Sequence, residues 1–177
     1  MGADTVQRAR RVRLMLFDVD GVLTDGTLYL GQGGELMKAF NVRDGHGLKM
    51  LRESGIEVGL LSTRQSAIVE ARASELGIAL VLQGATDKRA VLGRLLAERN
   101  LTAEHCGYMG DDLVDLPVLV HCGFAAAVAD APEPVRARAH YVARASGGHG
   151  AAREVCEFIL RAQGTLKRAI EGFLGRT

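Results

Sequence analysis

The sequence predicts an α/β fold, a Rossmann-like three-layer sandwich built on one parallel sheet. Short apolar runs alternate with helical patterns along the chain, and strands spaced by helices of this length require right-handed crossovers, which give a parallel sheet covered on both faces. Three of the apolar runs end in polar residues, as expected where the carboxyl ends of parallel strands bind a ligand. The 177 residues fit one domain, residues 1–177, with its core at about residues 12–163.

The predicted strands are short apolar runs that end in loops. Parallel strands are expected at residues 12–17, 57–61, 78–82, 106–109, 124–128 and 141–142. Residues 27–30 and 36–40 flank Gly31-Gln32-Gly33-Gly34 and therefore predict a small projecting β-hairpin.

Helical periodicity occurs between and after these strands. Helices are predicted at residues 45–54, 65–76, 87–100, 116–121, 132–139 and 151–163. Gly55 and Gly77 are expected to end the first two, as glycine does at helix C-termini. The tail, residues 164–177, has apolar residues at helical spacing, and we expect it to be mobile because so short a helix is marginal alone. The basic residues from Arg8 to Arg13 are interpreted as a solvated lead-in to the first strand.

Composition and charge exclude several classes of protein. The net charge of +1 indicates neither a nucleic-acid nor a membrane partner, and no apolar run approaches the roughly 18 residues of a membrane span. The start of the chain lacks the apolar core of a signal peptide. Cys106, Cys122 and Cys156 are widely spaced and odd in number, which argues against disulfides or a zinc site and for a reducing compartment. We therefore expect a soluble, cytoplasmic protein.

Acidic residues follow two of the predicted strands. Asp18 and Asp20 come directly after the first strand, and Asp111 follows the strand at 106–109. A single acid in such a place could equally be a helix N-cap, which is one interpretation of Asp112. Two acidic strand ends in one parallel sheet would bury uncompensated charge unless a cation holds them. Mg²⁺ prefers oxygen ligands and shares carboxylates with phosphate, so the sequence predicts a magnesium site.

With a cation present, these residues can transfer a phosphoryl group. Asp18 is placed to attack phosphorus and form an aspartyl-phosphate, and Asp20 can protonate the leaving oxygen and then activate water. Lys88, at a predicted helix start, can neutralise Asp18 and the phosphoryl oxygens, although a lone lysine there is usually surface. The hydroxyl of Ser62, with neighbouring backbone N–H groups, can hold the phosphoryl group.

The candidate catalytic residues occur in four ordered motifs. These are Asp18-Val-Asp-Gly-Val-Leu-Thr24, the strand-end Ser62, Lys88, and Gly110-Asp-Asp-Leu-Val-Asp115. In this order and spacing they resemble the motifs of the haloacid dehalogenase-like phosphatase superfamily. Members with a cap domain insert it after the first motif or between the second and third, and neither interval here has room for a domain. The resemblance therefore implies a capless member.

Further segments narrow the resemblance within that superfamily. They are Asp25-Gly-Thr-Leu-Tyr29, Phe40-Asn-Val-Arg-Asp-Gly45, Gln83-Gly84, Ala139-His-Tyr-Val142 and Gly147-Gly-His-Gly150. They resemble capless phosphatases that act on a phosphorylated 3-deoxy eight-carbon sugar acid in lipopolysaccharide precursor synthesis. A phosphatase for a nine-carbon sugar acid phosphate would share these motifs and is an alternative. A non-catalytic regulatory protein on the same fold is an alternative of another class, and it should have lost Asp18, Asp20 or Lys88.

The resemblance also implies roles for individual residues. It makes Asp18 the nucleophile and a metal ligand, Asp20 the acid/base and a backbone-carbonyl ligand, and Asp111 the third protein ligand. The positions that would line the substrate pocket, some from a neighbouring subunit, are Asp20, Asn41, Val42, Arg43, Asp44, Gly45, Lys49, Arg64, Arg72, Lys88 and Asp112. Guanidinium binds both phosphate and carboxylate bidentately, which suits a phosphorylated sugar acid.

The resemblance further implies a homotetramer. In similar phosphatases the hairpin packs against neighbours and closes the site, and the C-terminal tail reaches a neighbouring subunit's site. The alternative for residues 164–177 is a final helix docked permanently on its own subunit.

Three residues depart from the family pattern. Thr63 stands where glycine is usual, which leaves open whether Ser62 or Thr63 supplies the hydroxyl; we favour Ser62. Lys49 stands where arginine is common, so the positive charge is kept but the bidentate hydrogen bonding of a guanidinium group is lost. His149 interrupts what is often Gly-Gly-Arg-Gly, so the role of its loop is open, as is that of Asp115.

Overall fold

The main sheet is entirely parallel, as predicted. In the computed structural model, which describes residues 2–175, six strands lie in the order β5-β4-β1-β6-β7-β8. They are β1 (Leu14–Phe17), β4 (Glu57–Leu61), β5 (Leu80–Leu82), β6 (Cys106–Gly110), β7 (Phe124–Ala127) and β8 (Tyr141–Val142). All four residues of β1 are buried, because helices cover both faces of this inner strand and its apolar run continues without alternation.

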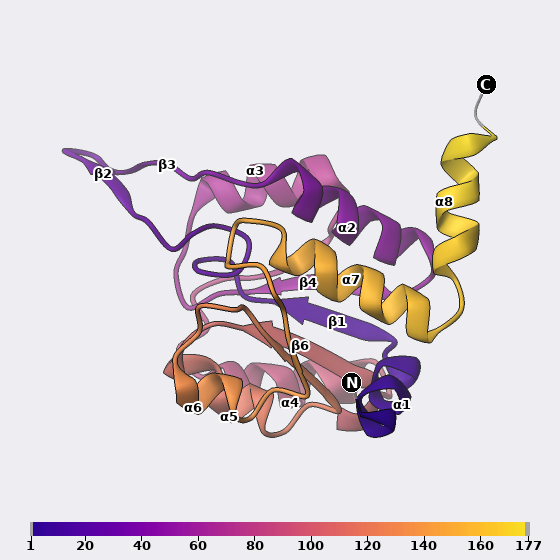
Figure 1. The fold of residues 1–177 in the computed structure, drawn as a ribbon. Coiled ribbons are helices and arrows are strands. Elements are labelled where there is room, and N and C mark those ends of the chain that lie inside the picture. The colour runs from indigo at the N-terminus through magenta and orange to yellow at the C-terminus, as the bar shows by residue number, and fades with distance from the viewer. Residues whose placement is uncertain (1, 176–177) are drawn as a thin grey trace.

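Helices cover both faces of the sheet and complete the three layers. The helices of the described residues are α1 (Ala3–Arg11), α2 (Val42–Glu53), α3 (Ala67–Leu76), α4 (Lys88–Glu98), α5 (Leu116–Leu119), α6 (Glu133–Arg136), α7 (Ala151–Ala162) and α8 (Leu166–Leu174), with short 3₁₀ helices η1 (Ala103–His105) and η2 (Leu113–Asp115). In Figure 1, α2, α3 and α7 lie on one face of the sheet, and α4, α5 and α6 lie on the other. The predicted sandwich is confirmed.

Helix α3 ends where the sequence predicts. Gly77 has φ +68°, a left-handed conformation that glycine adopts without strain. Its N–H donates to the Ser74 carbonyl at 2.9 Å, and the N–H of Ile78 donates to the Ala73 carbonyl at 2.8 Å. These bonds satisfy carbonyls at the helix end and turn the chain into β5.

The predicted hairpin lies outside the layers of the sandwich. Strands β2 (Tyr29–Gly31) and β3 (Gly34–Met37) pair antiparallel. They project from the edge of the molecule at which the strands of the main sheet end (Figure 1). The hairpin exposes several large apolar side chains, namely Leu28, Tyr29, Leu30, Leu36 and Met37. The intervals after β1 and between β4 and α4 hold no cap domain within the described residues.

The N-terminal segment is largely exposed, as predicted, but it is helical and attached to the body of the protein. It forms α1, although only Ala9 of this helix is fully buried. Basic side chains attach it to the body: Arg8 donates to the Gly123 carbonyl at 3.1 Å, and Arg10 donates to the Ala162 carbonyl at 3.0 Å. The basic cluster therefore docks α1 on neighbouring elements.

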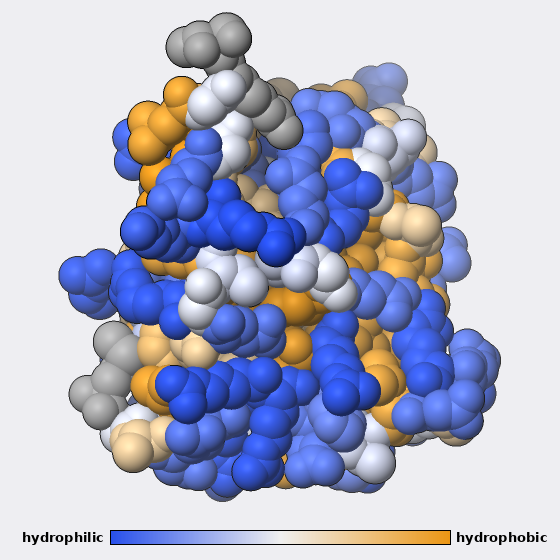
Figure 2. Space-filling view, turned by 90° about the vertical axis from the view of Figure 1, so that its right-hand side faces the viewer, coloured by the Kyte–Doolittle hydropathy of each residue, from blue (hydrophilic) through white to orange (hydrophobic). Residues whose placement is uncertain are grey.

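The tail forms helix α8, which stands at the end of the molecule opposite the hairpin (Figure 1). Leu166 and Ala169 pack against the core, and the ring of Phe173 lies 5.0 Å from that of His46 on α2. Figure 2 shows this end, where most of the surface is hydrophilic and a hydrophobic patch lies beside the C-terminus. Mobility of the tail stays a prediction, and residues 176–177 lie outside the described range.

Two predictions from composition can be compared with the structure. The three cysteines are free and buried, as predicted, and burial raises their pKa values. Across residues 2–175, the helices are too short or too polar for any of them to traverse a bilayer.

Candidate active site

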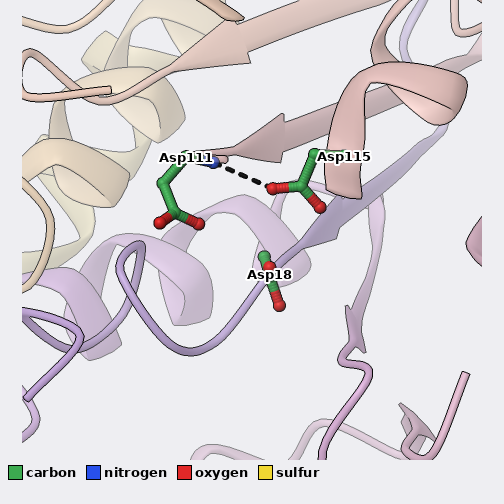
Figure 3. A group of neighbouring side chains, drawn as sticks. All are labelled: Asp18, Asp111 and Asp115. Carbon is green, nitrogen blue, oxygen red and sulfur yellow. Dashed lines mark hydrogen bonds between the residues drawn. The ribbon is translucent and has the colours of Figure 1, made fainter. Parts of the chain in front are cut away.

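Three acidic side chains meet where adjacent strands end. Strand β1 pairs with β4 on one side and with β6 on the other, so Asp18 lies level with the ends of both neighbours. Asp18 follows β1, Asp111 follows β6, and Asp115 ends the short helix η2. Figure 3 shows the three side chains gathered at these strand ends, and each offers an oxygen within 4.8 Å of the others. The predicted convergence of Asp18 and Asp111 is confirmed.

The loop after β1 approaches these carboxylates closely. Gly21 has φ +84°, and a Cβ there would lie 2.0 Å from Oδ2 of Asp111, so a larger residue would displace that carboxylate. The loop at Gly147 packs on the same segment, where a Cβ would lie 1.8 Å from the Gly21 carbonyl oxygen. The N–H of Gly148 donates to the Val22 carbonyl at 3.0 Å. This loop, whose role the sequence left open, thus supports the backbone of the site.

Lys88 is the cation of the cluster. Its side chain is 2% exposed, and its Nζ lies 2.7 Å from Oδ2 of Asp18 and 2.7 Å from Oδ1 of Asp115. Burial lowers the pKa of Lys88, but the two carboxylates outweigh burial and raise the pKa above its usual value. The lysine is therefore charged and belongs to the site, not to the surface.

Asp115 belongs to the acidic cluster, although sequence reasoning did not assign it a role. Its side chain is fully buried, and it accepts from Lys88 and, at 2.5 Å, from the Tyr108 hydroxyl. Its other oxygen accepts from the backbone N–H groups of Asp111 at 3.0 Å and Asp112 at 3.3 Å. With both oxygens so occupied, Asp115 fits a positioning role better than that of a metal ligand. The acidic end of the fourth motif was the only signal in the sequence.

The cluster carries excess negative charge. Three carboxylates face the single ammonium of Lys88. Burial, with the charge of Asp115 added and Lys88 opposing, raises the pKa of Asp18 to about 7. Burial and the charges of Asp18 and Asp115 raise the pKa of Asp111 to about 8. A hard divalent cation would compensate this repulsion, so the oxygen donors present fit Mg²⁺, as predicted.

The carboxylate of Asp20 lies outside this cluster and faces the hairpin. It pairs with the ammonium of Lys38, and Nε of Arg64 lies 3.5 Å from its Oδ2. Its side chain therefore does not join the group of Asp18 and Asp111, which agrees with a ligand role through the backbone only. Sequence reasoning missed Lys38 and its second partner Glu35, because neither stands in a motif.

Ser62 ends the strand beside Asp18, at β4. It is 3% exposed, and its Oγ accepts from the N–H of Arg64 at 3.2 Å. In residues 2–175 this oxygen donates no hydrogen bond of its own, so the hydroxyl can donate to a bound oxyanion. Thr63 is exposed. The geometry favours Ser62, although the choice between the two stays a prediction.

Two of the expected pocket residues fix the start of α2 in this chain. Asn41 caps the helix by accepting from the N–H of Arg43 at 2.8 Å. Asp44 is buried and accepts from the N–H groups of Gly150 at 3.1 Å and Arg153 at 2.7 Å, at the beginning of α7. Burial raises the pKa of Asp44 despite these bonds. Both side chains make structural contacts here, and a substrate contact stays a prediction.

The other expected pocket residues are spread over several elements. Arg72 reaches from α3 over the Phe40 ring, 5.8 Å from its centroid, and crosses Gly45, where a Cβ would lie 2.3 Å from Nη2 of the arginine. Val42 and Arg43 are exposed, and Lys49 is half-buried further along α2. Within residues 2–175, these last three form no hydrogen bond or ion pair with the clustered aspartates. Asp112 caps η2, accepting from the N–H of Leu113 at 2.7 Å, as the cap interpretation expects.

Comparisons with known proteins agree with this geometry. Residues 61–155 match the family model described as haloacid dehalogenase-like hydrolase. The chain is 47% identical to 3-deoxy-D-manno-octulosonate 8-phosphate phosphatase KdsC of Yersinia pestis, over 94% of this chain and 89% of that one.

Two solved structures are closely similar. A probable yrbi family phosphatase from Pseudomonas syringae pv. phaseolica superposes with a TM-score of 0.96 at 50% identity, covering 99% of this chain and 100% of that chain. The 3-deoxy-D-manno-octulosonate 8-phosphate phosphatase from Moraxella catarrhalis, in complex with magnesium, phosphate and KDO, superposes with a TM-score of 0.94 at 40% identity. The match covers 98% of this chain and 99% of that chain. With the four motifs assembled at one edge of a parallel sheet, this chain belongs to the haloacid dehalogenase-like hydrolase family.

Proposed function

We propose that this chain is a Mg²⁺-dependent phosphatase that hydrolyses 3-deoxy-D-manno-octulosonate 8-phosphate to the free sugar acid and phosphate, a step of lipopolysaccharide precursor synthesis in the cytoplasm. One observation carries the chemistry: Asp18 lies against the ammonium of Lys88 and beside Asp111 at the carboxyl edge of the sheet. The substrate assignment is supported by two relatives that are 3-deoxy-D-manno-octulosonate 8-phosphate phosphatases. One is 47% identical to this chain, and the other, whose solved structure contains KDO, is 40% identical.

In the first step Asp18 acts as the nucleophile. A carboxylate oxygen of Asp18 forms a bond to phosphorus while the bond from phosphorus to the sugar oxygen breaks. Asp20 gives its proton to that leaving oxygen, so the sugar departs as a neutral alcohol. Lys88 compensates the charge that gathers on the phosphoryl oxygens.

In the second step the aspartyl-phosphate is hydrolysed. The ionised Asp20 takes a proton from water, the water oxygen bonds to phosphorus, and the bond between Asp18 and phosphorus breaks. Phosphate leaves, and Asp18 and the protonated Asp20 are regenerated. Asp115 keeps Lys88 in place through both steps, since it holds the same ammonium at 2.7 Å.

We assign the magnesium ligands to Asp18, Asp111 and the backbone carbonyl of Asp20. When bound, Mg²⁺ supplies positive charge that orients the phosphoryl oxygens and stabilises the charge developing on them.

Binding of the substrate is assigned to groups around this centre. We propose that the Ser62 hydroxyl holds a phosphoryl oxygen and that Arg64, 42% exposed, contacts the anionic groups of the sugar acid. Arg43, Lys49 and Arg72 add positive charge to the pocket, in part across a subunit boundary. We further propose one hydrolase domain over residues 1–177 and a homotetramer.

Phosphate release across a panel of phosphorylated sugars tests this proposal. We expect the highest kcat/KM for 3-deoxy-D-manno-octulosonate 8-phosphate, a lower value for a nine-carbon sugar acid phosphate, and the lowest for glucose 6-phosphate. Arg64→Ala should lower kcat/KM for the sugar acids more than for glucose 6-phosphate. An equal kcat/KM for the sugar acids and glucose 6-phosphate would contradict the substrate assignment, and preference for the nine-carbon acid would replace it with the alternative.

A further inference from the structure

We propose that Lys38 is a positioning residue for the phosphoryl-transfer reaction. From the base of the hairpin, Lys38 fixes the orientation of the Asp20 carboxylate. The inference rests on the proposed function, because it gives the proposed general acid its partner. Lys38 directly follows β3 and lies outside all four motifs. It is therefore a residue of the hairpin, not of the parallel sheet that carries the other catalytic groups.

The side chain of Lys38 is built into the site. It is 1% exposed, and its ammonium contacts Oδ1 of Asp20 and, at 2.9 Å, Oε1 of Glu35. A buried ammonium without partners would strongly destabilise the fold, so its place between two carboxylates is strongly determined. The Asp20 side chain is itself only 19% exposed. Lys38 and Asp20 thus form a pair shielded from solvent.

The far side of Lys38 is anchored as well. Glu35 accepts from the hydroxyl of Ser66, which stands at the start of α3 and is 8% exposed. The N–H of Ser66 donates to Oε1 of Gln83 at 2.8 Å. A continuous chain of contacts therefore runs from Asp20 through Lys38 and Glu35 to the helix that follows the second motif.

Arg64 provides an instructive contrast. Its guanidinium lies near the same two carboxylates, at 3.5 Å from Asp20 and 3.6 Å from Glu35, but its side chain is 42% exposed. The longer contacts and the exposure suit a group that can turn toward an incoming anion. Lys38 is the fixed cation of this group of charges, and Arg64 is the adjustable one.

The arrangement assigns different tasks to the two oxygens of Asp20. Lys38 holds Oδ1, whereas Oδ2 lies 3.5 Å from Nε of the exposed Arg64. With Oδ1 held, rotation of the carboxyl group is restricted, and Oδ2 is left to give its proton to the leaving sugar oxygen. Proton transfer requires heavy atoms about 2.6–3.2 Å apart, so a carboxyl group free to rotate would reach this geometry less often.

The test measures kcat/KM of the Lys38→Met variant on two substrates that differ in their leaving group. Methionine approximates the length of the lysine side chain and removes its charge. The value of kcat/KM reports steps up to departure of the leaving group, so the later role of Asp20 as a base does not enter. We expect kcat/KM for 3-deoxy-D-manno-octulosonate 8-phosphate to fall by about 10- to 100-fold, within the range of general acid catalysis. For p-nitrophenyl phosphate, whose leaving group needs no proton, the loss should stay below about threefold. Retained activity on the aryl phosphate also shows that the site is folded.

Asp20→Asn and the double variant show whether Lys38 acts through Asp20. Asp20→Asn should give the same leaving-group pattern, and adding Lys38→Met to it should cause no further loss on the sugar phosphate. Ser66→Ala, which removes only the far anchor, should produce a smaller loss of the same kind and serves if Lys38→Met does not fold. Equal losses on both substrates, or a full additional loss in the double variant, would overturn the proposal. Failure of the proposed function is distinguishable, because the wild-type protein would then not release phosphate from the sugar acid phosphate.

Discussion

The Nζ atom of Lys88 lies 2.7 Å from Oδ2 of Asp18. This contact joins the start of α4 to the end of β1, two segments 70 residues apart in the sequence. It places a cation where phosphoryl charge would develop in the proposed reaction, and it partly offsets the cost of burying the Asp18 carboxylate, the proposed nucleophile. Because Asp115 contacts the same ammonium, the position of Lys88 depends on both carboxylates.

Removal of Asp115 should therefore destabilise the fold and impair catalysis. Asp115→Ala leaves the ammonium of Lys88, the Tyr108 hydroxyl and two backbone N–H groups without their acceptor. We expect a loss of roughly 3–5 kcal/mol in the free energy of unfolding, as for other broken buried ion pairs. Tyr108→Phe is the matched control, with a loss of about 1–2 kcal/mol from one hydroxyl. Urea unfolding measures both, and similar small losses would show that Asp115 does not hold the cluster together.

The metal-free protein should lose stability as the pH rises. The pKa of Asp18 is raised to about 7 and that of Asp111 to about 8, against an unfolded value of about 3.9. The folded state therefore binds protons more tightly than the unfolded state, so raising the pH from about 4 to about 8 removes this contribution to stability. Mg²⁺ binds the ionised carboxylates, so the stabilisation that it gives should grow over the same interval.

Thermal unfolding at pH 5.5 and pH 8.5, with chelator or with Mg²⁺, measures this dependence. The increase in Tm caused by Mg²⁺ should be larger at pH 8.5, and Asp111→Asn should reduce the difference between the two pH values. A Tm increase of the same size at both pH values would contradict the assignment of the aspartates as ligands.

The hairpin should hold subunits together in a homotetramer. Leu30 and Leu36 are 63% and 66% exposed, and together with Leu28, Tyr29 and Met37 they present more apolar surface than a two-stranded hairpin should leave in water. Light scattering on the purified protein measures the mass directly. Leu30→Ser combined with Leu36→Ser should lower that mass and the activity together. Full activity from a wild-type monomer at micromolar concentration would remove both the assembly and its catalytic role.

The tail should gate the active site of a neighbouring subunit. Within one chain α8 lies at the end of the molecule opposite the hairpin, so gating requires a second copy (Figure 1). Its apolar side chains, such as Ile170 and Leu174, are 48% and 74% exposed. Deletion of residues 164–177 should change kcat and KM together, as lids do, while metal binding and folding stay intact. Kinetics like those of the full chain, in a well-folded truncated protein, would assign the tail to packing on its own subunit.

Much of the fold follows from local sequence signals. The uninterrupted apolar run of β1 identifies an inner parallel strand, and Gly77 marks the end of α3 because few other residues tolerate its backbone conformation. Helix α1 was missed because its attachment depends on Arg8 and Arg10, whose acceptors lie more than 100 residues away. No local pattern reveals such partners.

The candidate site likewise contains residues that could be predicted from the sequence and residues that could not. Asp18 and Asp111 could be predicted because the topology of a parallel sheet brings strand ends together whatever the side chains do. Roles for Asp115 and Lys38 could not be assigned, since each depends on a contact with a residue distant in the sequence. Asp115 contacts the buried Lys88, and Lys38 contacts the carboxylate of Asp20 in another loop. Their roles depend on tertiary contacts, which composition and spacing do not contain.

Phosphate release from 3-deoxy-D-manno-octulosonate 8-phosphate, by wild type and by Asp18→Asn, tests the central claim most directly. Asparagine keeps the shape of the side chain and removes the attacking oxygen charge, and thermal unfolding confirms that the variant is folded. We expect turnover by wild type in Mg²⁺, none by wild type in excess chelator, and none by Asp18→Asn with Mg²⁺. Turnover that persists in chelator, or in the folded Asp18→Asn variant, would contradict a metal-dependent mechanism with Asp18 as the nucleophile.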